Sequence, residues 1–260
     1  MEYKGKTALI TGASSGIGLD YAKEFARRGA NVILVARRQQ ELAKLADQIT
    51  KEFGVETHVI AMDLATLKAG DELVAAVAKG KHGVDILVNN AGFGTSGRLE
   101  NEKRERVQQE IVLNVATLTD LTAAFLPAMV KKGFGAIINI ASTASFQPVP
   151  GMAVYAATKA YVRSFTEAVW GEVEGTGVKV LSVSPGAPAT EFFDVAGSKS
   201  VGNLAPVAQV VSATFKALDA KFTPPSIVVG GQNAMMAAIS QRMPAKTVIK
   251  VAGKMFLPRR

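Results

Sequence analysis

The chain has 260 residues, of which 48% are hydrophobic and 20% are charged, a composition typical of a globular protein with a sizeable core rather than of a disordered chain. It has no cysteine and only two histidines, His58 and His82, which excludes disulfides, thiol nucleophiles and cysteine-bound metals and makes a histidine-centred triad or a zinc site unexpected. The net charge of +8 permits binding to polyanions, but no nucleic-acid-binding module accompanies it, so we expect no nucleic-acid partner.

The beginning of the chain predicts neither a secretory signal nor a membrane span. Residues 1–6 lead directly into a strand-like run without a signal-peptide apolar region. No apolar stretch approaches the roughly 20 residues that cross a bilayer. We therefore expect a cytoplasmic protein. Without an internal repeat or a linker, residues 1–260 should form a single domain, with a core over about 5–230 and a basic extension over about 231–260.

The first predicted unit is a strand, a glycine-rich loop and a helix. Residues 6–11 read as a short buried strand, and a helical pattern runs from residue 17 to about residue 28. Glycines in the loop allow a tight turn and close approach to a ligand, and the free amides at the helix start point at an anion, usually a pyrophosphate. A loop without ligand is the alternative, but the order strand, loop, helix favours a dinucleotide site. The candidate cofactor-binding residues here are Gly12, Ser14, Ser15, Gly16, Ile17 and Gly18.

The second predicted strand, 31–36, ends in two arginines. In this architecture an acidic residue at the strand end commonly binds the ribose 2′-hydroxyl and would repel a 2′-phosphate. Arg37 and Arg38 instead offer guanidinium groups that suit a phosphate. They could also be solvated residues that begin the next helix. We expect NADP(H) to be preferred over NAD(H).

The third predicted strand, 56–61, follows a helix over 39–52 and leads to Asp63 and Leu64 at the cofactor cleft. Asp63 could accept a hydrogen bond from an adenine amino group, or it could begin a turn.

The fourth predicted strand, 84–89, follows a helix over 71–79 and ends in two consecutive asparagines. The amides of Asn89 and Asn90 can tie neighbouring strand ends together and form one wall of a cofactor cleft. The cofactor-binding candidates at this strand end are Asn90, Ala91 and Gly92.

A long helical region over 100–131 contains Asn114, and a buried strand over 136–141 follows it. Asparagine is a poor residue inside a helix, so Asn114 should locally disturb the backbone hydrogen bonds. Ser142 stands at the carboxyl end of the strand, where open α/β sheets bind their ligands. Taken alone, Ser142 would read as a turn or cap residue.

Tyr155 and Lys159 lie four residues apart in a helical region that runs to about residue 174, so their side chains can share one helix face. An ordinary tyrosine has a pKa of about 10, and a nearby cation lowers it toward the range of a useful general acid or base. A surface lysine beside a half-buried tyrosine is the alternative.

The ordered set of these residues resembles the short-chain dehydrogenase/reductase family, in its compact NADP-dependent form. The matching residues are Thr11-Gly12, Gly16-Ile17-Gly18, Asp63, Asn89 to Gly92, Asn114, Ser142, Tyr155 with Lys159, and Pro185-Gly186 with Thr190. The resemblance implies an α/β Rossmann-type fold with a doubly wound parallel sheet of about seven strands. It also implies reversible hydride transfer between NADP(H) and a carbonyl or secondary alcohol.

The resemblance assigns roles to four catalytic candidates. Tyr155 would protonate the developing alkoxide, and Ser142, thirteen residues earlier, would donate a hydrogen bond to the same oxygen. Lys159 would lower the tyrosine pKa and contact the nicotinamide ribose. The backbone carbonyl of Asn114 would hold a water that links Lys159 to solvent, whereas an interhelical hydrogen bond is the alternative for that asparagine. The long helical region and the Tyr155 helix would form a homodimer surface.

The strand over 178–184 leads to a loop that receives the nicotinamide carboxamide in the family. Pro185, Gly186 and Thr190 are the candidate contacts. Pro188 stands where the family often has a valine or isoleucine that donates its N–H, which proline lacks. Carboxamide recognition should therefore depend on Thr190 or on a shifted loop.

The substrate pocket is expected to be apolar. Residues 191–203 suit a mobile lid, and aromatic residues lie on several crevice loops. Ordinary packing beneath the loops is the alternative. An apolar ketone such as a 3-oxoacyl thioester, a steroid-like ketone or an aryl ketone would fit. Pocket candidates are Phe93, Ser142, Phe146, Val149, Tyr155, Phe192 and Phe193.

The chain ends with a helix over 205–218, a strand over 226–229 and a tail whose last residues, 242–260, are basic. Lys246, Lys250 and Lys254 would form one helical stripe, and Val248, Ala252 and Met255 another. That pattern resembles a membrane-surface helix, whereas a solvated helix packed on its own domain is the favoured alternative. Non-catalytic NADP binding and a scaffold at a membrane surface are the rival functions.

Overall fold

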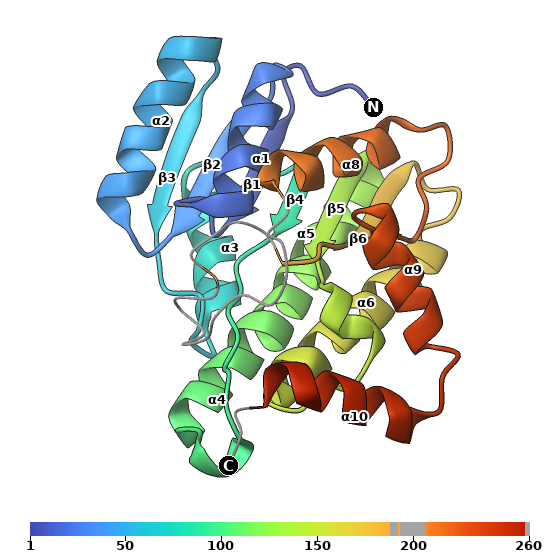
Figure 1. The fold of residues 1–260 in the computed structure, drawn as a ribbon. Helices are drawn as coiled ribbons and strands as arrows, with labels where there is room; N and C mark the ends of the chain where they lie inside the picture. The colour runs from blue at the N-terminus through green and yellow to red at the C-terminus, as the bar shows by residue number, and fades with distance from the viewer. Residues whose placement is uncertain (188–191, 193–205, 258–260) are drawn as a thin grey trace.

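In the computed structural model, a seven-stranded parallel sheet runs through the centre of the molecule, with helices on both faces (Figure 1). The structure describes residues 1–187, 192 and 206–257. Four features predicted from the sequence therefore lie outside the described residues: Pro188, Thr190, Phe193 and most of the expected lid.

The strand order is β3-β2-β1-β4-β5-β6-β7, and every adjacent pair is parallel. The strands are β1 (Thr7–Thr11), β2 (Asn31–Ala36), β3 (Thr57–Ala61), β4 (Ile86–Asn89), β5 (Gly135–Ile140), β6 (Val178–Ser184) and β7 (Ser226–Val228). The chain reverses its direction of travel across the sheet between β1 and β4, which creates the crevice where such sheets bind ligands. The predicted doubly wound α/β fold is confirmed.

The central strands are almost continuous apolar runs because both of their faces are covered. Successive residues of β1 show this directly: Ile10 packs into one core, with Phe25 and Phe215, and Leu9 packs into the other, with Leu73. The first core lies under α1 (Gly16–Arg27), α2 (Gln39–Phe53) and α8 (Val207–Asp219). The second lies under α3 (Ala69–Lys79), α5 (Leu118–Lys132) and α6 (Ala153–Glu172).

The long helical region predicted over 100–131 is a composite. A 3₁₀ turn at Leu99–Asn101 precedes α4 (Arg104–Ile111), a π-helical segment follows at Val112–Thr117, and α5 continues the same stretch. Asn114 lies within the π segment, so the predicted disturbance of the helical hydrogen bonds is confirmed.

The composite helix Arg104–Lys132 is long and apolar enough, by length and composition alone, to cross a membrane. The sequence analysis expected no such stretch. This is weak support for a span, because core helices of soluble proteins meet the same criterion.

Beyond β7 the chain forms two further helices, α9 (Gly231–Ser240) and α10 (Ala245–Phe256), of which α9 was not predicted. Val248 and Ala252 of α10 are buried, whereas Lys246, Lys250 and Lys254 are exposed. Two residues of the predicted apolar stripe, Val248 and Ala252, therefore pack on their own domain, as the favoured alternative for the basic tail required, whereas the third, Met255, is exposed.

Candidate active site

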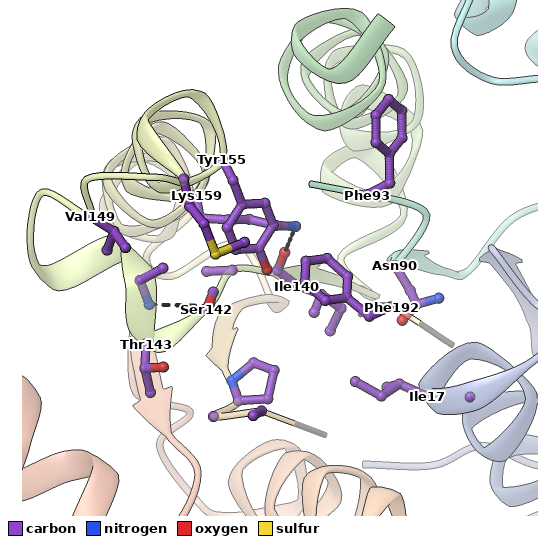
Figure 2. Close-up of a pocket in the computed structure, with 18 of the residues that line it drawn as sticks. Ile17, Asn90, Phe93, Ile140, Ser142, Thr143, Val149, Tyr155, Lys159 and Phe192 are labelled. Carbon is purple, nitrogen blue, oxygen red and sulfur yellow. Dashed lines mark hydrogen bonds between the residues drawn. The ribbon is translucent and has the colours of Figure 1, made fainter. Parts of the chain in front are cut away.

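A cavity of about 820 Å³ opens along the carboxyl ends of β1, β4, β5 and β6 (Figure 2). Its wall includes the residues that follow these strands: Gly12, Asn90, Ser142 and Pro185. It begins at the glycine-rich loop and continues past Tyr155 to the helices at the end of the chain. The topology therefore brings the separate sequence motifs to one place.

The glycine-rich loop has a geometry that side chains would block. Gly12 has φ of 68° and Gly16 has φ of 55°, the left-handed region that favours glycine. A Cβ atom on Gly18 would come within 2.3 Å of the Gly12 carbonyl oxygen and 2.6 Å of Asn90 Nδ2. The loop can thus keep its backbone close to a bound group at the start of α1, as a pyrophosphate site requires.

The two consecutive asparagines join three strands, as predicted. Asn89 Nδ2 donates to Asn139 Oδ1 of β5 at 2.9 Å, and Asn90 Nδ2 donates to the Thr11 carbonyl oxygen of β1 at 2.9 Å. Thr11 Oγ1 in turn accepts from the backbone N–H groups of Asn90 and Ala91, each at 3.0 Å. These bonds hold the cavity wall between the glycine-rich loop and Gly92.

The arginines at the end of β2 lie at the outer end of the cavity. Arg37 and Arg38 are exposed and line it. Arg38 Nε and Nη2 donate to Ser14 Oγ at 3.2 and 3.1 Å, which draws the guanidinium over the glycine-rich loop. Asp63 also lines the cavity, and its Oδ1 accepts from the Ala65 N–H at 3.0 Å, so it forms the predicted turn without leaving the cleft.

Tyr155 and Ser142 meet in the middle of the cavity wall (Figure 2). Ser142 follows β5, and its Oγ accepts from the Ala144 N–H at 3.1 Å. Burial raises the pKa of Tyr155 to about 12, a hydrogen bond with Ser142 lowers it, and the charge of Glu110 raises it. The expected lowering of the Tyr155 pKa by Lys159 is therefore wrong for the protein alone, because burial is the largest influence and the hydrogen bond that lowers the pKa comes from Ser142.

Lys159 is buried behind Tyr155. Its Nζ donates to the Ile140 carbonyl oxygen at 2.7 Å and lies 5.8 Å from the centroid of the tyrosine ring. Burial lowers the pKa of Lys159 to about 8, opposed by the charge of Glu110, which raises it. The predicted pairing of tyrosine and lysine on one helix face is present, but the ammonium is held against β5 rather than against the phenol.

Asn114 is fully buried and uses its side chain to fix the loop after β4. Its Nδ2 donates to the Phe93 carbonyl oxygen at 2.9 Å, and its Oδ1 accepts from the Phe93 N–H at 3.2 Å. Nδ2 also donates to Thr158 Oγ1 of α6 at 3.1 Å, which is the interhelical bond considered as the alternative. The role of its backbone carbonyl in holding a water stays a prediction.

Of the apolar residues predicted to line the substrate pocket, some line the cavity and one does not. Phe93, Val149 and Phe192 line the cavity, and the Phe192 ring lies 5.1 Å from the Tyr155 ring (Figure 2). Phe146 was wrongly predicted to do so. It ends a 3₁₀ helix, Thr143–Phe146, and packs beneath the Arg163 guanidinium, which lies 4.2 Å from its ring centroid.

Two groups of residues were missed by sequence reasoning. The first lies on α9, α10 and the turn between them and completes the apolar end of the cavity. Its members are Met236, Ile239, Met243, Val251 and Met255. The apolar positions at helical spacing in the tail were the signal that could have found them. The second is the single residue Glu110. Its carboxyl is fully buried, and no pattern in the sequence indicated that burial.

Comparison with known proteins gives consistent relatives. The sequence profile of the family described as short chain dehydrogenase matches residues 6–200. An uncharacterized oxidoreductase of Staphylococcus epidermidis is 36% identical over 201 residues, which cover 76% of this chain and 86% of that protein. The very-long-chain 3-oxoacyl-CoA reductase of Bos taurus is 34% identical over 199 residues, covering 74% of this chain but only 62% of the bovine protein.

Solved structures extend the similarity to most of the chain. A short-chain dehydrogenase from Sphingobium yanoikuyae in complex with NADPH has a TM-score of 0.79 and 33% identity, covering 92% of this chain and 97% of that one. A 7β-hydroxysteroid dehydrogenase has a TM-score of 0.85 and 26% identity, covering 97% of this chain and 98% of that one.

Proposed function

We propose that this chain, which belongs to the short chain dehydrogenase family and is therefore an oxidoreductase acting on alcohol or carbonyl groups, is an NADP(H)-dependent reductase of an apolar ketone. One observation carries the proposal. The hydroxyl groups of Ser142 and Tyr155 meet on the wall of a cavity that has a dinucleotide-type glycine loop at one end and an apolar pocket at the other.

The residues present fit a dinucleotide. The glycine-rich loop would hold the pyrophosphate at the start of α1, and Asp63 and Leu64 line the part of the cleft suited to the adenine. Arg37 and Arg38 offer the guanidinium groups that a 2′-phosphate needs, which supports NADP(H) over NAD(H). A related structure that contains NADPH supports the same choice. When bound, NADPH supplies the hydride for the reaction.

The side chains supply the proton and the orientation. With its pKa raised to about 12, Tyr155 carries its proton at neutral pH and is in the correct state to protonate a developing alkoxide. Ser142 is placed to donate to the same oxygen and stabilise the growing charge. Lys159 contributes a buried cation 5.8 Å from the centroid of the Tyr155 ring, and it would contact the nicotinamide ribose when the cofactor is bound, as the family resemblance implies.

The substrate is a small molecule with an apolar body. Methionine and aliphatic side chains from α9 and α10 line the same cavity as Phe192 and Tyr155, so the apolar body of a bulky acyl or polycyclic ketone would leave water on entry. The bovine relative acts on very-long-chain 3-oxoacyl-CoA, and one structural relative acts on hydroxysteroids, both of which have large apolar bodies. We propose 3-oxoacyl thioesters and steroid-like ketones as the first substrates to test.

The test is NADPH oxidation with acyl, steroid and aryl ketones, using the wild type and Tyr155→Phe. The variant should bind NADPH with unchanged affinity, because the phenol oxygen is not needed for binding, but its kcat should fall about 100-fold or more. Thr143→Val, next to Ser142 but not assigned to the reaction, is the control. Undiminished turnover in Tyr155→Phe would overturn the assignment of the acid, and absence of NADPH binding by the wild type would overturn the function.

A further inference from the structure

Glu110 is a carboxyl that the proposed reaction does not use, although it lies beside the reacting groups. It is on the last turn of α4 and is fully buried, an expensive position for an acid unless it is hydrogen-bonded. Its Oε2 accepts from the Thr95 N–H at 3.0 Å and from Thr95 Oγ1 at 2.7 Å. Within the described part of the chain, Oε1 is buried without a hydrogen-bond partner.

The bonds from Thr95 to Glu110, together with bonds from Asn114, fix the loop after β4. Asn114, one helical turn after Glu110, holds Phe93 by both its N–H and its carbonyl, and Glu110 holds Thr95 two residues further on. The residue between them is Gly94, where a Cβ would lie only 3.0 Å from Tyr155 Cδ2. The segment that the two side chains fix is therefore the one on which the tyrosine ring rests.

Glu110 also acts on the reacting groups through its charge. It raises the pKa of Lys159 and of Tyr155. The charged groups of the described residues that act on Glu110 itself are Lys159 of α6 and Glu102, before α4. Burial raises the pKa of Glu110 to about 7, so its carboxylate forms before Lys159 loses its proton. Its charge is thus present in the pH range where the lysine titrates.

We propose that Glu110 is a positioning residue of the reductase reaction, which fixes the Phe93–Thr95 loop beneath Tyr155 and keeps Lys159 protonated through its buried negative charge. The proposal rests on the proposed function for its catalytic consequence. Its electrostatic part is a property of the protein itself.

Two substitutions separate the two effects. In Glu110→Gln the amide oxygen can still accept from Thr95, so the loop stays in place and only the charge is lost. Its kcat at neutral pH should stay within about threefold of the wild type, and the alkaline limb of its pH profile should move to lower pH by about half a unit or more. In Glu110→Ala both effects are lost, and kcat should fall at least about tenfold. The control is Glu105→Gln, which removes an equal charge from an exposed position on the same helix and should change neither quantity.

A second readout needs no turnover. The pKa of Glu110 is higher in the folded than in the unfolded chain, so the folded state binds the Glu110 proton more tightly. The stability that this gives is fully present below about pH 4.5 and is lost as the pH rises through about 7. The melting temperature of the wild type should therefore fall relative to that of Glu110→Gln between about pH 5 and about pH 8. Glu105→Gln should follow the wild type.

The outcomes distinguish the two proposals. An alkaline limb of Glu110→Gln that superimposes on the wild type, or one displaced equally in Glu105→Gln, would overturn the positioning role. If the wild type reduces no ketone, the reductase function fails, and the melting series still decides the electrostatic part. Parallel melting curves for wild type and Glu110→Gln across the pH range would then overturn it.

Discussion

Arg38 is the residue on which the cofactor preference depends most directly. Its guanidinium reaches over the glycine-rich loop to Ser14 Oγ, at the end of β2 where the 2′-position of a bound ribose would lie. We expect Arg38→Ala to raise the KM for NADPH about tenfold to 100-fold while leaving the KM for NADH almost unchanged, because only NADPH carries the phosphate. Steady-state kinetics with both cofactors measures the ratio.

The control for Arg38→Ala is Lys44→Ala, which removes a cation from the exposed face of α2, away from the cavity. An equal rise in the KM for NADPH and in the KM for NADH would contradict the assignment of Arg38 to the 2′-phosphate, and Arg38 would then be a residue that stabilises the loop.

The pKa of Lys159 predicts how turnover changes with pH. Its pKa is lowered to about 8 by burial, so the active, charged form should be lost as the pH rises through about 8, and turnover should fall there. Lys159→Met removes this group, and we expect it to lower kcat strongly and to abolish this alkaline limb. An unchanged limb in the residual activity of the variant would assign the ionisation to another group.

At the residue scale, the sequence predicts those site residues whose type and spacing carry chemical information. Ser142, Tyr155 and Lys159 were predicted correctly to lie in the cavity. Each pattern alone has an ordinary alternative, and their order along the chain, which resembles that of the family, made the prediction possible. The prediction that Phe146 lines the pocket was wrong, and Glu110 was not predicted, for the same physical reason. Whether a side chain turns toward a cavity, or is buried, depends on neighbours that are distant in the sequence.

At the scale of elements, apolar runs and glycines placed the central strands to within one or two residues, because strands buried on both faces have little room for polar residues. Asn114 marked the irregular part of its helix before the structure showed the π segment. The end of the chain was harder to interpret. The apolar stripe of α10 is equally suited to a membrane and to its own domain, and only the packing of Val248 and Ala252 distinguishes them.

The packing of α10 predicts that it is part of the pocket. Phe256 packs against the cluster that contains Val149, Met152 and Tyr155. The substitution Val248→Asp would place a charge in the buried face of α10. It should detach the helix, lower the melting temperature and raise the KM for a bulky ketone several-fold. Lys250→Glu changes the charge on the exposed face and should do neither. A normal KM in Val248→Asp would show that α10 is not needed for the pocket.

The basic stripe of α10 gives a separate prediction about membrane association. Val248 and Ala252 are buried, whereas Ile249, Val251 and Met255 are exposed on the same helix as the lysines. The exposed lysines attract an anionic surface, and each contributes about 1 kcal/mol or less at physiological salt. We therefore expect weak, salt-sensitive sedimentation with anionic liposomes, which a triple Lys→Glu change at 246, 250 and 254 abolishes. Salt-resistant binding would show that α10 inserts its apolar face.

At the scale of the whole molecule, the doubly wound parallel sheet of about seven strands was expected from the family resemblance, whereas the strand order comes from the structure, because no local pattern specifies which strands pair. The exposed apolar surface of the helices bears on how copies of the chain assemble. Only 28% of the most apolar part of the composite helix Arg104–Lys132 is buried within the chain. Ile111 of α4 is 44% exposed, and Tyr161 of α6 is 40% exposed and stacked on Phe165. Apolar surface of this kind on adjacent helices is typical of an interface between protein chains.

We therefore propose that the protein is a homodimer that buries α4, α5 and α6 against the same helices of a second copy. Tyr161→Arg, which places a charge on that surface, should convert the dimer to a monomer in analytical ultracentrifugation, because each copy of a two-fold interface would carry the change. Leu67→Arg is the matched control, since Leu67 is 86% exposed but lies before α3 rather than on these helices. A wild type that sediments as a monomer at micromolar concentration would contradict the dimer. Because α6 also carries Tyr155 and Lys159, dissociation should reduce turnover as well as size, and a fully active Tyr161→Arg monomer would show that the interface does not support the site.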